Sequence, residues 1–301
     1  MTKEETLARI QALKKVRKAV ILAHNYQIGE VQDVADFTGD SLGLSQEAAR
    51  VGAETIVFCG VHFMAETAAI LSPEKVVLLP DIKAGCPMAA MISAEELREW
   101  KKRYPGRKVV CYVNTTAEVK AESDVCCTSS NAVRVVNSIP DAEILFVPDK
   151  NLAAYVARQT GKKIIAWDGY CYVHNRISAR DVLEKKRLYP GAEVWVHPEC
   201  RPEVIDLADR VLSTGFMAKA ARETERRQVI VGTEAGILHR LRKENPKTEF
   251  FPVKEMAFCS NMKKITLRKV WKALEEMQYR VEVPPDVSRR ARGAIERMIA
   301  I

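Results

Sequence analysis

The chain has 301 residues, of which 47% are hydrophobic and 29% charged, with a formal net charge of +8 and an isoelectric point near 9.0. This composition is typical of a soluble globular protein, and no apolar run approaches the roughly 20 residues that span a bilayer, so we expect no membrane partner. Lysine and arginine are dispersed beside acidic residues, which argues against a nucleic-acid partner and leaves a positive field suited to small anions.

The first fifteen residues mix charged and apolar side chains at helical spacing and lack the continuous apolar segment of an export signal. We therefore expect a cytoplasmic location. The eight cysteines should then stay reduced, as metal ligands or buried thiols rather than as disulfides.

Short β-branched segments recur along the chain at nearly constant spacing. Setting His24, Tyr112 and His197 in register gives offsets of 88 and 85 residues. The same offsets superimpose three sets of segments without a gap. The first set is 20–26, 109–114 and 193–199, the second is 55–60, 143–148 and 228–233, and the third is 75–81, 163–169 and 248–254. Each set predicts one strand, so three strands repeat three times.

Helical patterns with apolar residues three and four apart separate these strands, for example in 45–53, 151–161 and 235–246. Alternating strands and helices predict parallel sheets covered by helices. We expect an α/β protein with three homologous three-layer αβα domains about a pseudo-threefold axis, formed by residues 1–88, 89–176 and 177–301, the last including C-terminal helices. The ungapped register makes the alternative, a single doubly wound sheet, the weaker interpretation.

Residues 283–301 have the pattern of an amphipathic helix, which we expect to pack back on the body of the protein with its arginines solvated.

Polar side chains end the first predicted strand of each copy, and ligands of parallel α/β sheets bind beyond the carboxyl ends of the strands. These residues are His24 and Tyr26, Tyr112 and Asn114, and His197 and Glu199. Seventeen residues after each leading residue a hydroxyl precedes a helical pattern: Ser41, Ser129 and Thr214. The three hydroxyls are either ordinary helix caps or, if they face a common axis, parts of an anion site.

A cysteine occupies the loop after the last predicted strand of each copy, namely Cys86, Cys171 and Cys259. If the copies surround one axis, the three thiols converge. Three thiolates could hold zinc, but a 4Fe-4S cluster normally takes four cysteines, so three would leave one iron open for Lewis-acid chemistry. We assign none of the other five to the cluster: Cys59, Cys111, Cys126, Cys127 and Cys200.

In the order of its motifs, the sequence resembles the quinolinate synthase family along essentially its full length. The motifs are AHNYQ (23–27), GDS (39–41), FMAE (63–66), YVN (112–114), TSSNAV (128–133), WxGxCxVH (167–174), HPE (197–199), STG (213–215) and CxNMK (259–263). The resemblance implies three α/β domains in a triangle around a 4Fe-4S cluster on Cys86, Cys171 and Cys259. Some relatives carry a second cysteine three positions from the last ligand, and its absence here makes a disulfide switch at that loop unexpected.

The resemblance also implies an activity, a transferase condensation of iminoaspartate with dihydroxyacetone phosphate to quinolinate, phosphate and two waters, in NAD biosynthesis. A functional link to an enzyme that produces iminoaspartate follows from it. The implied substrate contacts are His24, Ser41, Tyr112, Asn114, Ser129, His174, His197, Glu199, Ser213 and Thr214. Glu199 is the candidate base, a role that a pKa raised by burial would suit, and Tyr26, Tyr112 and His197 are further catalytic candidates.

Three alternatives remain open from the residues alone. A different cluster-dependent hydro-lyase could act on a small di- or tricarboxylate. An iron-sulfur sensor or electron carrier would not need the converging hydroxyls and imidazoles. A structural zinc protein would use the same thiols, and His174 could be a structural residue.

Overall fold

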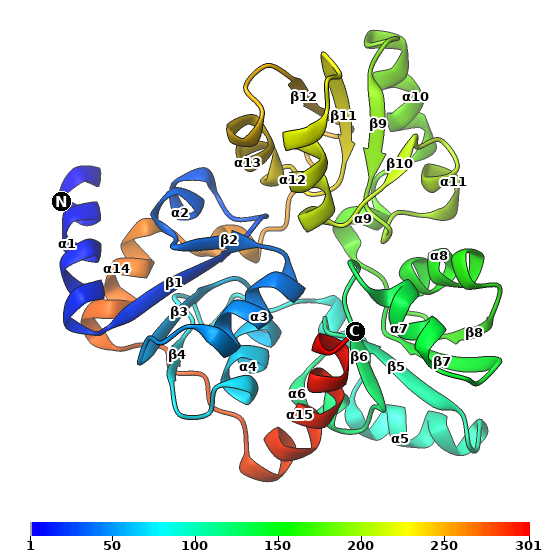
Figure 1. Ribbon diagram of the computed structural model, residues 1–301, viewed down its shortest axis with the longest axis horizontal. Helices are drawn as coiled ribbons and strands as arrows, with labels where there is room; N and C mark the ends of the chain where they lie inside the picture. The colour runs from blue at the N-terminus through cyan, green and yellow to red at the C-terminus, as the bar shows by residue number, and fades with distance from the viewer. Residues whose placement is uncertain (1) are drawn as a thin grey trace.

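The computed structural model describes residues 2–301 as an α/β protein with three four-stranded sheets (Figure 1). The first sheet contains β1 (Ala19–His24), β2 (Phe37–Gly39), β3 (Thr55–Cys59) and β4 (Val76–Leu78). The second contains β5 (Lys108–Tyr112), β6 (Val125–Cys127), β7 (Glu143–Val147) and β8 (Lys163–Ala166). The third contains β9 (Glu193–Val196), β10 (Arg210–Val211), β11 (Gln228–Gly232) and β12 (Glu249–Pro252). Their orders, β2-β1-β3-β4, β6-β5-β7-β8 and β10-β9-β11-β12, are equivalent, and every pairing is parallel. The predicted α/β class with three parallel sheets is confirmed.

The repeat keeps its predicted register. β3, β7 and β11 begin at residues 55, 143 and 228, which are the offsets of 88 and 85 found in the sequence. Each sheet also has a fourth strand that was not predicted, β2, β6 or β10. These edge strands have only two or three residues, too few to show a hydrophobic period.

Helices occupy equivalent places in the three units. Each sheet with its helices is called a unit, and in each unit one helix follows each of the first three strands. In the first unit these are α2 (Gly29–Val34), α3 (Ser41–Arg50) and α4 (His62–Leu71). In the second they are α6 (Ala117–Ala121), α7 (Ala132–Ser138) and α8 (Lys150–Thr160), and in the third α11 (Pro202–Ile205), α12 (Thr214–Glu223) and α13 (Ile237–Glu244). The others are α1 (Lys3–Val16), α5 (Ala94–Arg103), α9 (Tyr172–Asn175), α10 (Ala179–Leu188), α14 (Leu267–Glu276), α15 (Pro285–Ile299) and 3-10 helices at Met88–Met91 and Met262–Lys264. Figure 1 shows the units side by side around a common centre. The domain boundaries at 88 and 176 stay predictions.

A carboxylate anchors the first strand of each sheet near its amino end. The strand N–H donates to an aspartate Oδ2 at 2.8 Å for Ile21 and Asp36, 2.8 Å for Val109 and Asp124, and 2.7 Å for Val194 and Asp209. The three aspartates lie in repeat register. Interior strands such as β3 are buried along their whole length, as parallel strands covered on both faces require.

The C-terminal segment returns to the first and second units. α14 packs on α1, Val281 N donates to Val77 O at 2.8 Å, and α15 packs on α4, α6 and β6 (Figure 1). The predicted terminal helix is therefore confirmed, but its arginines are not all solvated: Arg292 Nη2 donates at 2.8 Å to the carbonyl oxygens of Ile70 and Leu71. These carbonyls end α4 and have no partner within that helix.

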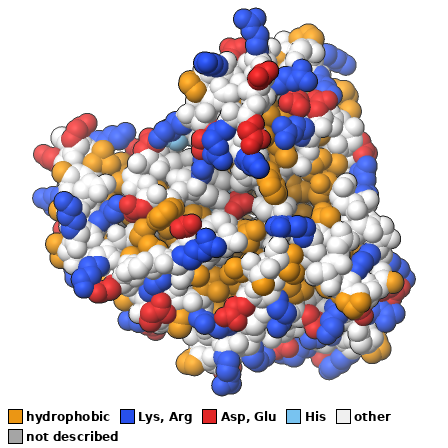
Figure 2. Space-filling view, in the orientation of Figure 1, with side chains coloured by type: hydrophobic (Ala, Val, Ile, Leu, Met, Phe, Trp, Pro, Cys, Tyr) orange, Lys and Arg blue, Asp and Glu red, His pale blue; other side chains and the backbone are white. Residues whose placement is uncertain are grey.

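Lysine and arginine side chains are scattered among acidic ones over the face drawn in Figure 2. Among the described residues, no helix has both the length and the apolar character needed to cross a membrane.

Candidate active site

A cavity at the meeting point of the three units receives side chains from each of them. Cys86, Cys171 and Cys259 line it, each from the loop that follows the last strand of its own sheet. The structure thus brings to one cavity three thiols that are more than 80 residues apart in the sequence. The other five cysteines are buried and do not line this cavity.

All but one of the predicted catalytic and substrate-contacting residues line the same cavity. They are His24, Tyr26, Ser41, Tyr112, Asn114, Ser129, His174, His197, Glu199 and Thr214. Apolar side chains complete much of the wall: Val61, Phe63, Met64, Met88, Val173 and Met262. Polar groups in such surroundings interact more strongly than they would in water. The individual roles of the predicted residues stay predictions.

Ser213, the exception, caps a helix beneath the cavity. Its hydroxyl accepts from Phe216 N at 3.4 Å as the N-cap of α12, and Asp40 caps α3 in the same way through Gly43 N at 2.8 Å. Ser41 and Thr214 are therefore the first residues of their helices, not caps.

The three units meet at these helix starts. Ser130, of the second unit, donates a hydrogen bond to the Asp40 carboxylate of the first unit and lies 2.7 Å from the Ser213 hydroxyl of the third. Gly215 is needed at this point, because a Cβ there would lie 2.6 Å from Asp40 Oδ2. The STG and GDS motifs are thus parts of one junction.

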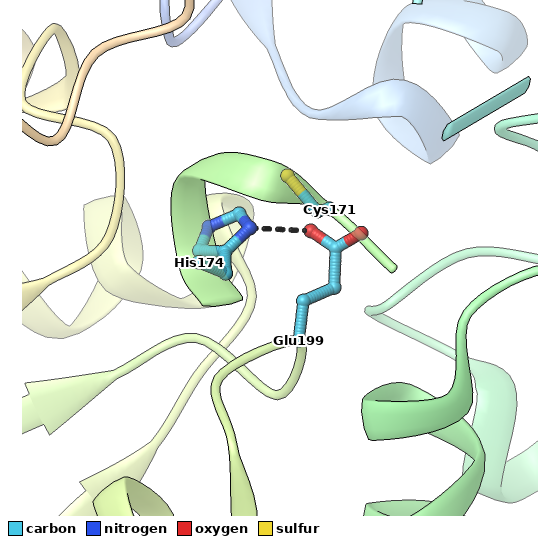
Figure 3. A group of neighbouring side chains, drawn as sticks. All are labelled: Cys171, His174 and Glu199. Atoms are coloured by element: carbon cyan, nitrogen blue, oxygen red, sulfur yellow. Dashed lines mark ion pairs between the residues drawn. The ribbon is translucent and has the colours of Figure 1, made fainter. Parts of the chain in front are cut away.

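Glu199 is buried between two imidazoles. Its Oε2 lies 2.9 Å from His174 Nδ1 and 3.2 Å from His197 Nδ1, and Figure 3 shows His174 and Glu199 pointing toward each other with Cys171 next to them. Burial by itself would raise the pKa of Glu199, but His174 and His197 hold it below its ordinary value. The pKa raised by burial that would suit a base is therefore not found, since the two imidazoles outweigh desolvation.

The tyrosine hydroxyls of the cavity are protonated. Burial, with the Glu199 charge, raises the pKa of Tyr26 and of Tyr112 well above its ordinary value. Burial also lowers the pKa of His24 to about 3, so that this imidazole is neutral. The cavity therefore offers proton donors beside an ionised carboxylate.

Thr233, which the sequence did not single out, links Tyr26 to His174. Its Oγ1 lies 2.5 Å from the Tyr26 hydroxyl and 2.8 Å from His174 Nε2. With the His174 to Glu199 contact, a chain of polar atoms runs from the Tyr26 phenol to the carboxylate. Thr233 directly follows β11, and this position was the only signal in the sequence.

Glu234 and Asp40 also line the cavity and were also missed. Glu234 is fully buried and forms an ion pair of 2.8 Å with Lys263, in the CxNMK motif. Glu234 directly follows the predicted strand segment 228–233, of which Thr233 is the last residue, whereas Asp40 is the middle residue of the GDS motif.

The three cysteines fit a metal cluster better than a single ion. In the described chain, only Cys171, His174 and Glu199 form a set of possible ligand atoms that all lie within 4.8 Å of one another. Cys86, Cys171 and Cys259 do not form such a set, so at least one pair of their sulfurs is farther apart than 4.8 Å, whereas thiolates on one tetrahedral zinc are roughly 3.8 Å apart, given Zn–S bonds of about 2.3 Å.

Two of the three thiols, those of Cys86 and Cys171, are not poised as nucleophiles. Burial raises the pKa of Cys86 to about 12 and that of Cys171 well above its ordinary value. Catalytic cysteines instead have lowered pKa values. A metal displaces the thiol proton, so a ligand role is compatible with this environment.

Comparison with known proteins gives a consistent result over the whole chain. Residues 8–300 match the family model described as "Quinolinate synthetase A protein". A quinolinate synthase of Dehalococcoides mccartyi is 62% identical over 293 residues, covering 97% of each chain. Quinolinate synthases of Thermodesulfovibrio yellowstonii, with 98% of each chain covered, and Methanoregula boonei, with 97%, are 54% and 57% identical.

Proposed function

The chain belongs to the quinolinate synthase family, and from this we propose that it condenses iminoaspartate with dihydroxyacetone phosphate to give quinolinate, phosphate and two waters. This is a transferase reaction that forms a carbon-carbon bond. We further propose that Cys86, Cys171 and Cys259 hold a 4Fe-4S cluster. When bound, such a cluster supplies an iron without a protein ligand, which acts as a Lewis acid.

The observation that carries the proposal is the shared cavity. Three thiols from three equivalent loops line the same wall as an ionised carboxylate, two protonated phenols and a neutral imidazole. An electron carrier would need the thiols but not these acids and bases. A structural metal site would not need a cavity lined by these groups.

The starts of α3 and α12 are suited to hold the anionic groups of the substrates. Ser41 and Thr214 are the first residues of these helices, where free backbone N–H groups and the helix dipole attract carboxylate and phosphate. The Thr214 hydroxyl already accepts from Asn25 Nδ2 at 3.0 Å, which leaves its own proton available to a ligand. Ser129 adds a third hydroxyl to the wall.

Glu199 offers the substrate a free acceptor atom, although its lowered pKa makes it a weaker base than an ordinary carboxylate. In the described part of the chain its Oε1 has no hydrogen-bond partner, although it is buried and faces the cavity wall. A buried acceptor without a partner costs free energy, which a substrate donor would recover. Carbon-carbon bond formation and two dehydrations move several protons, and Tyr26 and Tyr112 are suited to donate them.

An anaerobic assay tests this proposal. The purified protein, reconstituted with iron and sulfide, should form quinolinate from dihydroxyacetone phosphate only when iminoaspartate is generated in the mixture. We propose that a separate enzyme supplies iminoaspartate, because imines hydrolyse in water.

Three results would favour the alternatives. Dehydration of a di- or tricarboxylate without quinolinate formation would indicate another hydro-lyase. An electron paramagnetic resonance signal that substrates leave unchanged would indicate a sensor or electron carrier. Zinc in place of iron after anaerobic purification would indicate a zinc protein, for which Cys171, His174 and Glu199 are suitable ligands.

A further inference from the structure

The three cysteine loops are attached to their sheets by the same backbone hydrogen bond. In each loop, the backbone carbonyl two residues before the cysteine accepts a hydrogen bond. The donor is the backbone N–H of the residue three positions after the end of the third strand of that sheet. The bonds are His62 N to Ala84 O at 2.8 Å, Lys150 N to Gly169 O at 2.8 Å, and Ala235 N to Ala257 O at 2.7 Å.

The residue just before each donor differs between the units. In the second unit Asp149 Oδ2 accepts from Cys171 N at 3.0 Å, and in the third Glu234 Oε1 accepts from Cys259 N at 2.9 Å. The first unit has Val61 at the equivalent place, which offers no acceptor. Throughout residues 2–301, no hydrogen bond is found for the Cys86 amide. A carboxyl oxygen thus accepts from the backbone N–H of Cys171 and from that of Cys259, but none accepts from that of Cys86.

Both carboxylates are fully buried, and both of their oxygens are used. Asp149 Oδ1 accepts from Leu152 N at 2.7 Å and so caps α8. Glu234 Oε2 accepts from Gly236 N at 2.7 Å, while Oε1 also pairs with Lys263. A side chain held at both oxygens has little freedom, so it fixes the amide that donates to it.

The fold of the repeat does not itself require an acid at this place. The aspartates at the amino ends of β1, β5 and β9 recur in all three units, as a structural requirement of the repeat would. The acids on the cysteine amides occur in two units only, and the first unit forms the same sheet with valine. In the second and third units the acid thus links the cysteine loop to the segment after the third strand, where its other oxygen accepts from Leu152 N or Gly236 N.

We propose that Asp149 and Glu234 are positioning residues that hold the Cys171 and Cys259 loops ready to bind the cluster, while the Cys86 loop is left to adjust. This inference rests on the cluster of the proposed function. Groups that hydrogen-bond metal-bearing segments commonly change metal affinity 10- to 100-fold when they are lost.

The test uses Asp149→Asn and Glu234→Gln. In the first variant the new amide can still cap α8 through its carbonyl oxygen, but its NH2 group then faces the Cys171 N–H, and two donors repel. In the second variant the new amide likewise has one carbonyl for the N–H groups of Gly236 and Cys259. The matched control is Asp124→Asn, which likewise replaces with an amide a carboxyl group that accepts from a backbone N–H, here that of Val109, and that pairs with a lysine, Lys108 at 2.9 Å.

The first readout is the rate at which the reconstituted proteins lose iron to a chelator without oxygen. We expect about 10-fold faster loss from Asp149→Asn and Glu234→Gln than from wild type, and an unchanged rate for Asp124→Asn. Urea unfolding of the metal-free proteins shows whether a variant is merely unstable. Equal rates of iron loss in all four proteins would overturn the proposal.

The second readout does not need the cluster. Labelling the cysteines with nitrogen-15 gives eight amide signals, whose hydrogen exchange can be followed in metal-free protein. The Cys86 amide should exchange faster than those of Cys171 and Cys259, and each variant should accelerate only the amide it faces. If wild type binds no cluster, the proposed cofactor is wrong, and the exchange rates still decide whether these acids hold the loops.

Discussion

The imidazole rings of His174 and His197 lie stacked, with centroids 4.5 Å apart and planes 16° apart. His174 belongs to α9, after Cys171, and His197 follows β9. Both approach the same oxygen of Glu199, at 2.9 and 3.2 Å. The stack thus fixes one carboxylate oxygen and keeps the group ionised, leaving the other oxygen for the substrate.

Glu199→Gln should therefore remove activity without removing the metal. Since general-base catalysis contributes about 10²- to 10⁴-fold, we expect kcat to fall by about that factor. The amide has nearly the same shape, so iron and sulfide content should match wild type. Because the pKa of Glu199 lies below its ordinary 4.5, its protonation should not limit kcat of the wild type above that pH. A kcat close to the wild-type value would exclude Glu199 as the base.

Cys86→Ser, Cys171→Ser and Cys259→Ser should each lose the cluster. Serine keeps the size of the side chain but is a poor ligand for iron-sulfur clusters, so the broad visible absorbance and the activity should disappear together. Cys127→Ala is the control, since Cys127 is buried in β6 and does not line the cavity. A serine variant that keeps full iron content and activity would remove that cysteine from the ligand set.

The sequence predicted those features that carry a periodic signal. The strand register and the three sheets follow from offsets of 88 and 85 residues, and each cysteine loop follows the last strand of its copy, although the cysteines are spaced 85 and 88 residues apart and so depart from that register by three residues. β2, β6 and β10 could not be predicted, because two or three residues show no period. The capping roles of Asp40 and Ser213 differ by one residue from the prediction, which is the usual uncertainty of a helix start.

The site was predictable only where a side chain stood in a motif or at a repeated position. Asp149 and Glu234 become visible once equivalent loops are compared in three dimensions, because their partners are backbone amides. The direction of the Glu199 pKa shift could not be predicted either. Burial was foreseen, but the contact with His174, which lies 25 residues away in the sequence, exists only in the fold.

Thr214→Val should weaken binding of the phosphorylated substrate. The hydroxyl accepts from Asn25 and has its proton free for an anion, and valine keeps the shape but removes both functions. One hydrogen bond to a charged group contributes about 1.5–3 kcal/mol, so KM for dihydroxyacetone phosphate should rise about 10- to 100-fold. Steady-state kinetics at saturating iminoaspartate measures this. An unchanged KM would remove Thr214 from the anion site, and Thr214→Ser should largely keep wild-type behaviour.

Gly215→Ala should destabilise the junction of the three units. Alanine normally favours a helix by about 1 kcal/mol over glycine, but here its Cβ would lie 2.6 Å from Asp40 Oδ2. Asp40 is held by Gly43 N and Ser130, so moving it breaks those bonds, and we expect a net loss of about 1–3 kcal/mol in the free energy of unfolding. Gly191→Ala, where a Cβ meets no atom within 4 Å, should be nearly neutral in the same urea titration.

Glu122 joins the C-terminal helix to the second unit through two arginines. Its Oε1 lies 2.8 Å from Arg290 Nη1 of α15 and 3.0 Å from Arg98 Nη1 of α5. Burial would raise the pKa of Glu122, but the hydrogen bonds from Arg290 and Arg98 hold it below 4.5. A carboxyl whose pKa is lower in the folded state stabilises the protein above its unfolded pKa, and this stabilisation is lost as the pH falls through the folded pKa.

Glu122→Gln should therefore destabilise the protein at pH 7 and have progressively less effect in acid. Both arginines are about half exposed, so we expect a loss of only about 0.5–1 kcal/mol at low ionic strength. Urea unfolding of the variant and of wild type at neutral pH and at several values below 4.5 measures the difference. Glu99→Gln, which removes an exposed pair with Lys102 within α5, serves as the control. A difference that grows in acid would mean that Glu122 is held by contacts other than its charge.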